Sequence, residues 1–265
     1  MRRAWTSCAS TVSRSKLPLM FSNKTILITG GNRGIGRAIA ESFAQAGANL
    51  LVHSRSDTQG FAEDMLDLAK RHGVQVERIA FDMVDTPAMK AAVNAALPVG
   101  RSIDVLVNNA GIFHSGLFQM TPVLDVRSVF DVNFFAQLEL TQLILRRMTR
   151  QKSGAIVNIG SIVGLDLSVG NIAYGTSKAA LMACTETLAA EVGSLGVRVN
   201  AVAPGLTHTE MAIQVGKKAE MRMIERTAMQ RAATAEEIAK VVLFLASDAA
   251  SFVNGQVISV NGGNR

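Results

Sequence analysis

The stretch TGGNRGIGRAIA, residues 29–40, decides the fold because it joins an apolar run, KTILITG at 24–30, to a helical pattern. Its glycines stand at 30, 34 and 36, with one more at 31, in the spacing G-x-x-x-G-x-G rather than G-x-G-x-x-G. Glycine permits a tight strand-to-helix turn and a close approach of the backbone to a pyrophosphate, which the free N–H groups of the helix can bind. The turn indicates a dinucleotide site, although a tight turn without a ligand would use the same residues.

Short apolar runs and helical patterns alternate along the rest of the chain, which indicates βα units around a parallel sheet. Strands are predicted at 24–30, 49–54, 76–81, 103–109, 154–161, 197–204 and 256–262. Helices are predicted near 35–46, 57–72, 86–97, 123–150, 172–194, 210–226 and 234–247. The expected fold is therefore α/β, a single doubly wound parallel sheet of the Rossmann type with about seven strands and helices on both faces. One domain is expected over residues 21–265, since no linker, repeat or low-complexity segment follows residue 24.

Composition excludes several classes of protein. Hydrophobic residues make up 48% of the 265 residues and charged residues 18%, which suits a large core rather than disorder. The net charge is +6, but the five Lys and Arg of residues 1–24 stand there without any Asp or Glu, and subtracting them leaves +1. A nearly neutral body does not provide the basic surface of a nucleic-acid binder. No apolar run is long enough to predict a membrane span, and the two cysteines do not have the spacing of metal ligands.

The N-terminal segment, residues 1–20, has the composition of a mitochondrial transit peptide, with Arg and Ser and no acidic residue. This predicts a location in the mitochondrial matrix. The alternative is translation from Met20, five residues before the apolar run TILIT, which predicts a cytoplasmic protein.

The end of the second strand indicates which cofactor the site prefers. NAD-binding proteins place Asp or Glu about 20 residues after the glycine turn, on the ribose 2′-hydroxyl. Here residues 50–57 read LLVHSRSD, and no acid occurs between Glu41 and Asp57. Arg33 in the glycine turn and Arg55 at the strand end suit a 2′-phosphate, unless either arginine simply faces solvent. The sequence therefore favours NADPH.

An ordered set of motifs follows. TGGNRGIG at 29–36, NNAG at 108–111 and PG at 204–205 are accompanied by Asn133, Ser161 and the Y-x-x-x-K of Tyr174 and Lys178. From about residue 22 to the C-terminus the chain resembles the short-chain dehydrogenase/reductase family, and within it the 3-oxoacyl-[acyl-carrier-protein] reductases. The resemblance implies the catalytic residues Asn133, Ser161, Tyr174 and Lys178. It implies cofactor contacts at Gly30, Asn32, Arg33, Gly34, Ile35, Gly36, Ser54, Arg55, Asp82, Met83, Asn109, Ala110, Gly111, Tyr174, Lys178, Pro204, Gly205, Thr207 and Thr209.

Tyr174 is the only tyrosine of the chain, and alcohol–ketone chemistry explains its place. The nicotinamide moves a hydride, so the protein must move a proton. A phenol can donate it, but its usual pKa of about 10 is high, and we expect Lys178, on the same helix face, to lower it. Ser161, at a strand end, can hold the substrate oxygen near Tyr174. By resemblance, Asn133 on the long helix anchors a water chain to the lysine.

The substrate is the least determined feature. Residues 206–231 are expected to form a helical lid whose methionines at 211, 221, 223 and 229 either line an acyl site or pack between helices. Acyl-carrier-protein docking in the resembled reductases uses basic residues near the site entrance. One such position is Lys152 here, but the other is Leu195; Lys217 and Lys218 are candidate substitutes.

Three functions remain open at this stage. The first is NADPH-dependent reduction of a 3-oxoacyl thioester in fatty-acid synthesis. The second is the same chemistry on a sugar, polyol or other ketone, and the third is cofactor binding without turnover. The helices at 123–150 and 172–194 are apolar on more than one face, which predicts a homotetramer.

Overall fold

The computed structural model describes residues 19–166, 168–213 and 216–264. Most of the predicted transit peptide, residues 1–18, lies outside the described residues. The sheet has seven strands in the order β3-β2-β1-β4-β5-β6-β7, and every pairing is parallel. The strands are β1 (Thr25–Ile28), β2 (Asn49–Ser54), β3 (Val76–Ala80), β4 (Val105–Asn108), β5 (Gly154–Ile159), β6 (Val197–Pro204) and β7 (Val257–Val260). The predicted α/β class, the number of strands and the doubly wound arrangement are confirmed.

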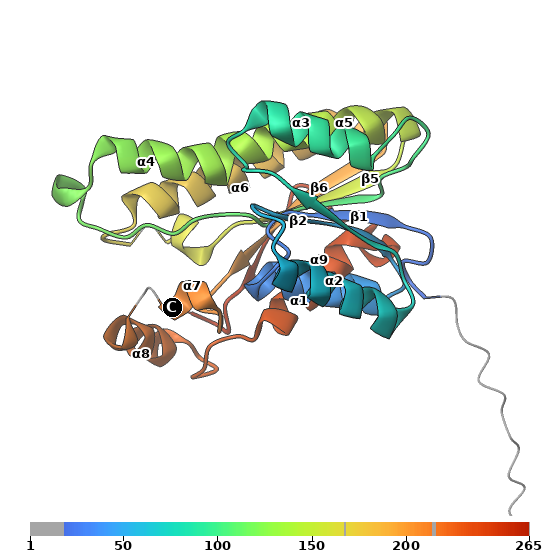
Figure 1. Ribbon diagram of the computed structural model, residues 1–265. Coiled ribbons are helices and arrows are strands. Elements are labelled where there is room, and N and C mark those ends of the chain that lie inside the picture. The colour runs from blue at the N-terminus through green and yellow to red at the C-terminus, as the bar shows by residue number, and fades with distance from the viewer. Residues whose placement is uncertain (1–18, 167, 214–215, 265) are drawn as a thin grey trace, which may run out of the picture.

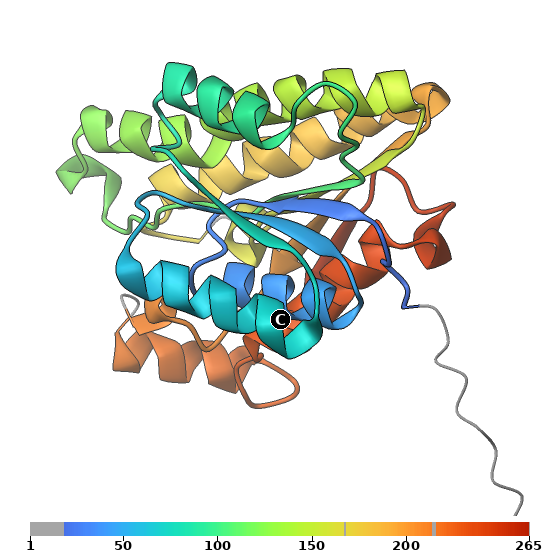
Figure 2. The same cartoon turned by 45° about the vertical axis from the view of Figure 1, so that its right-hand side comes forward.

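Helices cover both faces of this sheet (Figure 1). One face carries α1 (Gly34–Gln45), α2 (Gln59–His72) and α9 (Ala235–Ala246). The other carries α3 (Thr86–Ala96), α4 (Val123–Phe130), α5 (Ala136–Gln151) and α6 (Ile172–Val192). Two short helices, α7 (Glu210–Ile213) and α8 (Lys217–Arg226), lie together at one end of the molecule (Figures 1 and 2). None of the helices in the described parts of the chain is both long and apolar enough to cross a bilayer.

The strands alternate between two hydrophobic cores although their sequences are almost continuously apolar. In β1, Ile26 and Ile28 point into the core under α1, α2 and α9, whereas Leu27 points into the core under α3, α5 and α6. All three side chains are fully buried. A strand that is buried on both faces needs apolar side chains at every position, which is why an alternating polar pattern is missing from the sequence.

The predicted helix at 123–150 is interrupted. Between α4 and α5, residues Asp131–Phe135 form a π-helical turn, so the chain gains one residue per turn there. The predicted helix at 172–194 ends at Val192 and continues as a short 3₁₀ turn. The predicted lid helix at 210–226 is two helices, α7 and α8, on either side of residues 214–215. A π-turn inserts a single residue into a helix, and this shift is too small to be recognised in the spacing of the apolar side chains.

The strand order places a topological switch beside β1. β1 pairs with β2 on one side and with β4 on the other, so the chain winds outward in both directions from this point. In such sheets the crevice at the carboxyl ends of the strands is where ligands bind. The segments that follow β1, β2, β3 and β4 therefore meet at one edge, and they build the site described next.

Candidate active site

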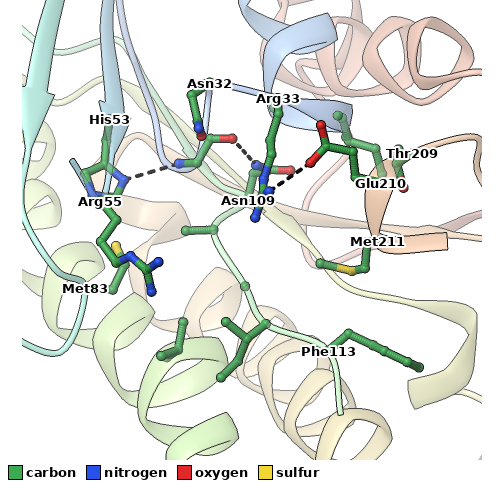
Figure 3. Close-up of a pocket in the computed structure, with 18 of the residues that line it drawn as sticks. Asn32, Arg33, His53, Arg55, Met83, Asn109, Phe113, Thr209, Glu210 and Met211 are labelled. Carbon is green, nitrogen blue, oxygen red and sulfur yellow. Dashed lines mark hydrogen bonds and ion pairs between the residues drawn. The ribbon is translucent and has the colours of Figure 1, made fainter. Parts of the chain in front are cut away.

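A cavity of about 780 Å³ lies at this edge, a size typical of ligand sites. It is walled by segments that follow β1, β2, β3 and β4 and by the start of α7 (Figure 3). Of the cofactor contacts expected from the sequence, it is lined by Gly30, Asn32, Arg33, Gly34, Ile35, Gly36, Arg55, Asp82, Met83, Asn109, Ala110, Gly111 and Thr209. The lining residues that the sequence analysis did not name as cofactor contacts are His53, Ser56, Thr58, Ile112, Phe113, Val132, Glu210 and Met211, the last of which it named as a candidate for the acyl site.

The glycine turn needs its glycines for two different reasons. Gly30 and Gly34 have φ of +62° and +54°, in the left-handed region that side chains disfavour. At Gly36 the constraint is steric, since a Cβ atom there would lie 2.1 Å from the carbonyl oxygen of Gly30. The carbonyl of Gly30 therefore lies so close to Gly36, in the first turn of α1, that no side chain fits between them.

The N-terminus of α1 faces this cavity and is suited to an anion. Its N-cap residue, Arg33, is extended and makes no side-chain capping bond, and no acidic residue stands in the first turn. The first amides of a helix lack partners within the helix and carry partial positive charge. These residues thus fit the pyrophosphate of a dinucleotide, which the amides of Gly34, Ile35 and Gly36 would hold.

His53 fastens the glycine turn to the neighbouring strands. The Gly30 N–H donates to Nδ1 of His53 over 3.2 Å, and Nε2 lies 2.9 Å from the carbonyl oxygen of Phe81. A carbonyl only accepts, so Nε2 must carry the proton and the ring must be neutral. Burial lowers the pKa of His53, which favours this neutral form. The sequence marked His53 only as a strand-end residue, and its link to Gly30 could not be read from it.

Thr29 and Asn109 tie the glycine turn to the NNAG segment. The Thr29 hydroxyl accepts from the backbone N–H groups of Asn109 and Ala110 over 2.8 and 2.9 Å. The Asn109 amide donates in return to the carbonyls of Thr29 and Gly30, at 2.8 and 3.1 Å. Asn109 was expected to contact the cofactor; in this structure its amide holds the turn, and the residue also lines the cavity.

The two arginines predicted to read the 2′-phosphate both line the cavity (Figure 3). Arg33 forms an exposed ion pair with Glu210 of α7, with Nη1 2.8 Å from Oε2. Ser54 is placed differently from Arg55. Its side chain is buried outside the lining and donates to the carbonyl of Ser56 over 2.6 Å, so it shapes the loop rather than facing the cavity.

At the end of β6 and just after it, the expected cofactor contacts are also divided between residues that line the cavity and residues that do not. Thr209 lines the cavity, whereas Pro204, Gly205 and Thr207 do not. The Thr207 hydroxyl is buried and donates to the carbonyl of Gly205 over 3.0 Å. The Gly205 N–H donates to Val260 of β7. These three residues position the segment that leads to α7.

Asn133 stands in the π-turn and is fully buried. Its Oδ1 accepts from the Ile112 N–H over 2.8 Å, and its Nδ2 donates to the Ile112 carbonyl over 2.9 Å and to the Ser177 hydroxyl over 3.1 Å. Asn133 therefore clamps the backbone just after NNAG to the helix that carries Tyr174. The contacts of Asn133 do not test the expectation that it anchors a water chain to Lys178.

Gln137, one turn later, makes a second clamp that the sequence analysis missed. Its amide nitrogen donates to the Ala110 carbonyl over 2.6 Å. The spacing of four residues from Asn133 is the signal that could have indicated it, since such residues share a helix face. Together the two amides fix Ala110 and Ile112, which form one wall of the cavity.

Ser161, Tyr174 and Lys178 come together beside this wall. Ser161 follows β5, is buried, and is hydrogen-bonded to the Tyr174 phenol. The Tyr174 ring packs edge-to-face against Phe113, with centroids 5.1 Å apart. A Cβ on Gly111 would lie 3.5 Å from Nζ of Lys178. Phe113 and Gly111 both line the cavity, so the three catalytic candidates adjoin it without lining it themselves.

The acid–base properties of this group differ from the expectation that Lys178 lowers the pKa of Tyr174. Burial raises the pKa of Tyr174, and the hydrogen bond with Ser161 opposes that rise without overcoming it. The Lys178 ammonium donates to the Ile159 carbonyl over 2.7 Å, and burial lowers its pKa to about 8. The expected lowering is therefore wrong for this structure. A raised pKa keeps the phenol protonated but makes it a weaker acid, so proton donation depends on how well the Lys178 charge stabilises the phenolate that forms.

The basic positions considered for carrier docking lie elsewhere. Lys152 is the C-cap residue of α5, two residues before β5, and Leu195 stands two residues before β6. A Cβ on Gly196 would lie 2.2 Å from the carbonyl oxygen of Lys152, so the two positions are neighbours. They stand at the amino ends of the strands, whereas the cavity lies at the carboxyl ends. The expectation that Lys152 is near the site entrance of its own chain is therefore wrong.

No group of His, Cys, Asp and Glu within the described ranges has the arrangement of a metal site.

The family profile described as enoyl-(acyl carrier protein) reductase matches residues 30–265. Two similar curated proteins are 3-oxoacyl-[acyl-carrier-protein] reductases. That of Aquifex aeolicus is 38% identical over 247 residues, which cover 93% of this chain and 99% of that protein. That of Chlamydia trachomatis is 38% identical over 241 residues, with 91% and 97% covered.

Solved structures of proteins described with other activities have the same fold. A protein described as a gluconate 5-dehydrogenase from Beutenbergia cavernae, with NADP bound at low occupancy, matches with a TM-score of 0.86 and 36% identity over 93% of this chain and 98% of that one. A protein described as a gluconate dehydrogenase from Agrobacterium tumefaciens matches with a TM-score of 0.88 and 30% identity, with 94% and 98% covered.

The neutral His53 bridge predicts acid sensitivity of cofactor binding. Its folded-state pKa is below the usual 6.5, so the bridge is intact above about pH 6.5 and is lost as the pH falls further. NADPH affinity, measured by the fluorescence of the reduced nicotinamide, should fall over this acid range. His53→Gln keeps one acceptor and one donor but does not titrate, so its affinity should vary less with pH. The exposed His208→Gln is the matched control, and a His53→Gln variant with the parent's pH curve would contradict the assignment.

Tyr174→Phe should abolish turnover and leave NADPH binding unchanged, since only the hydroxyl is removed. Loss of a proton donor costs about 10²- to 10⁴-fold in rate. In the parent, carbonyl reduction should slow as the pH rises through about 8, where Lys178 loses the charge that stabilises the forming phenolate. Turnover of Tyr174→Phe within a few-fold of the parent would show that the proton comes from another group.

Proposed function

The chain belongs to the short-chain dehydrogenase/reductase family, and we propose that it reduces the ketone of a 3-oxoacyl thioester, bound to acyl carrier protein, to the 3-hydroxyacyl form with NADPH. The observation that carries the proposal is the similarity of more than nine-tenths of the chain to 3-oxoacyl-[acyl-carrier-protein] reductases. Reduction of this kind belongs to fatty-acid synthesis. The Ser161–Tyr174–Lys178 group beside the cavity supplies the proton that such a reduction requires.

The cavity fits NADPH at both of its anionic groups. The uncapped start of α1 suits the pyrophosphate, while Arg33 and Arg55 suit the 2′-phosphate. In the described residues that line the cavity, the acids are Asp82 and Glu210, and neither stands at the end of β2, where NAD-binding proteins have one. When bound, NADPH supplies the hydride for the carbonyl carbon.

The protein supplies the proton and the placement of the substrate. The hydroxyls of Ser161 and Tyr174 are hydrogen-bonded to each other, and together they can hold the carbonyl oxygen. Tyr174 then donates its proton to that oxygen, and the phenolate that remains is stabilised by the Lys178 ammonium. Phe113 packs edge-to-face with the Tyr174 ring and so helps to hold it in place.

A second candidate is reduction or oxidation of a sugar acid or another small carbonyl compound. It is favoured by the structural similarity to proteins described as gluconate dehydrogenases and to levodione reductase, which matches with a TM-score of 0.86. The third possibility considered, a cofactor-binding protein without turnover, is opposed by the presence of all four catalytic candidates around one cavity.

Comparison of substrates tests the proposal. Oxidation of NADPH should be followed with acetoacetyl thioesters of acyl carrier protein and of coenzyme A, and with 5-ketogluconate and a cyclic diketone. We expect kcat/KM to be at least about tenfold higher for the thioesters. A higher value for 5-ketogluconate or the diketone would favour the second candidate, and no turnover of any carbonyl compound would favour the third.

The two arginines predict the cofactor preference. Arg55→Asp removes one charge-assisted partner of the 2′-phosphate, a loss of about 1.5–3 kcal/mol, and adds a repelling carboxylate. Since about 1.4 kcal/mol corresponds to a factor of ten, the KM for NADPH should rise at least tenfold. The KM for NADH should stay the same or fall. Arg127→Asp, an exposed change on α4, is the matched control. Equal use of both cofactors by the parent protein would contradict this assignment.

We also propose a homotetramer. Large apolar side chains are exposed at the start of α4 and in the π-turn, and again in α9 and the segment before β7: Val123, Leu124, Phe135, Phe244 and Phe252. Monomers seldom expose such patches. Light scattering should give four times the chain mass of 28.2 kDa. Phe135→Glu should reduce that mass while Leu66→Glu, an exposed position on α2, should not. A parent protein of single-chain mass would overturn the proposal.

Residues 1–20 are proposed as a mitochondrial matrix presequence, on the basis of their acid-free, Arg- and Ser-containing composition. Residues 1–24 fused to a reporter should carry it into the matrix and be cleaved near residue 20. A reporter that stays in the cytoplasm would instead favour translation from Met20.

A further inference from the structure

An ion pair crosses the mouth of the cofactor cavity. Arg33 belongs to the glycine turn and Glu210 is the first residue of α7, 177 positions away in the sequence. Their side chains meet over 2.8 Å, and both line the cavity (Figure 3). The start of α7 also packs on the turn itself, because a Cβ on Gly34 would lie 3.5 Å from the methyl group of Thr209.

This pair is easily broken. Both side chains are about two-thirds exposed, at 71% and 68%, and exposed ion pairs contribute little to stability. A phosphate monoester carries nearly two negative charges and binds a guanidinium through two parallel hydrogen bonds. A 2′-phosphate in the cavity is therefore a better partner for Arg33 than Glu210 is.

Arg55 provides an internal comparison. It lines the same cavity, and within the described parts of the chain it forms no ion pair. Arg55 can thus bind a phosphate without displacing another group. Arg33 can bind one only by releasing Glu210, and Glu210 is attached to the lid helix.

We propose that Glu210 occupies Arg33 in place of the 2′-phosphate, so that the pair straps α7 to the glycine turn until a 2′-phosphorylated cofactor takes Arg33. Glu210 thereby weakens cofactor binding, and the lid responds to the 2′-phosphate rather than to the dinucleotide as such. The inference rests on the proposed use of NADPH. It adds a specificity-determining residue on the lid to the two arginines that face the cofactor.

Adenosine fragments test the strap without turnover. 2′,5′-ADP carries the 2′-phosphate, and 5′-AMP is the matched ligand without it; neither contains nicotinamide to contact the lid. Binding of 2′,5′-ADP, but not of 5′-AMP, should increase hydrogen–deuterium exchange of the α7 amides. In Glu210→Gln that exchange should be raised already in the free protein, and 2′,5′-ADP should not increase it further.

Calorimetry provides the second measurement. Glu210→Gln should bind 2′,5′-ADP about threefold to tenfold more tightly than the parent and 5′-AMP equally well. Glu225→Gln, the same change of charge at an exposed position on α8, should leave both affinities unchanged. In an Arg33→Gln background, Glu210→Gln should have no effect on 2′,5′-ADP binding.

The outcomes separate the strap from the proposed function. Equal affinities of the parent for 2′,5′-ADP and 5′-AMP would overturn both the proposed preference for NADPH and the proposed role of the Arg33–Glu210 pair as a strap. Tight binding of 2′,5′-ADP with unchanged exchange in α7, or an equal effect of Glu210→Gln in the Arg33→Gln background, would overturn the strap alone.

Discussion

The close approach of Gly36 to the carbonyl of Gly30 is the constraint on which the site depends. A side chain at position 36 would collide with that carbonyl, so the backbone can turn from β1 into α1 within a few residues only if glycine stands there. The turn directs the start of α1 at the cavity, and the N-cap side chain makes no bond to the first amides. His53 and Asn109 hold it from two neighbouring strands. The anion site is thus rigid because the sheet around it is rigid.

The opposite wall is fixed by a helix irregularity. The π-turn at Asp131–Phe135 carries Asn133, and the first turn of α5 carries Gln137. Their amides hold the backbone at Ile112 and Ala110, and Asn133 also reaches Ser177 on α6. A π-turn is less favourable than α-helix and persists where its surroundings require it. Here it joins the cofactor wall to the helix of Tyr174, so binding and catalytic residues share one support.

Burial explains the acid–base properties of the catalytic group better than a charge on Lys178 does. The same burial raises the pKa of the Tyr174 phenol and lowers that of Lys178 to about 8, so the phenol is a weaker acid and the lysine a weaker base than either would be in water. The phenol stays protonated as a donor. The lysine keeps its charge near neutral pH only by a small margin, and its bond to the Ile159 carbonyl retains it at the site.

The sequence by itself determined the seven parallel strands and the glycine turn, because these rest on local backbone requirements and on apolar runs that bury both faces of a sheet. The catalytic residues were found from the sequence through the resemblance of their ordered motifs to a known family. It could not determine contacts between distant segments. Arg33 and Glu210 are 177 positions apart in the sequence. Lys152 stands between the catalytic residues Asn133 and Ser161 in the sequence, but it lies at the opposite end of the strands from the cavity. The π-turn and the raised pKa of Tyr174 were also decided by tertiary structure, since helix register and desolvation depend on what packs against a residue rather than on its neighbours in the chain.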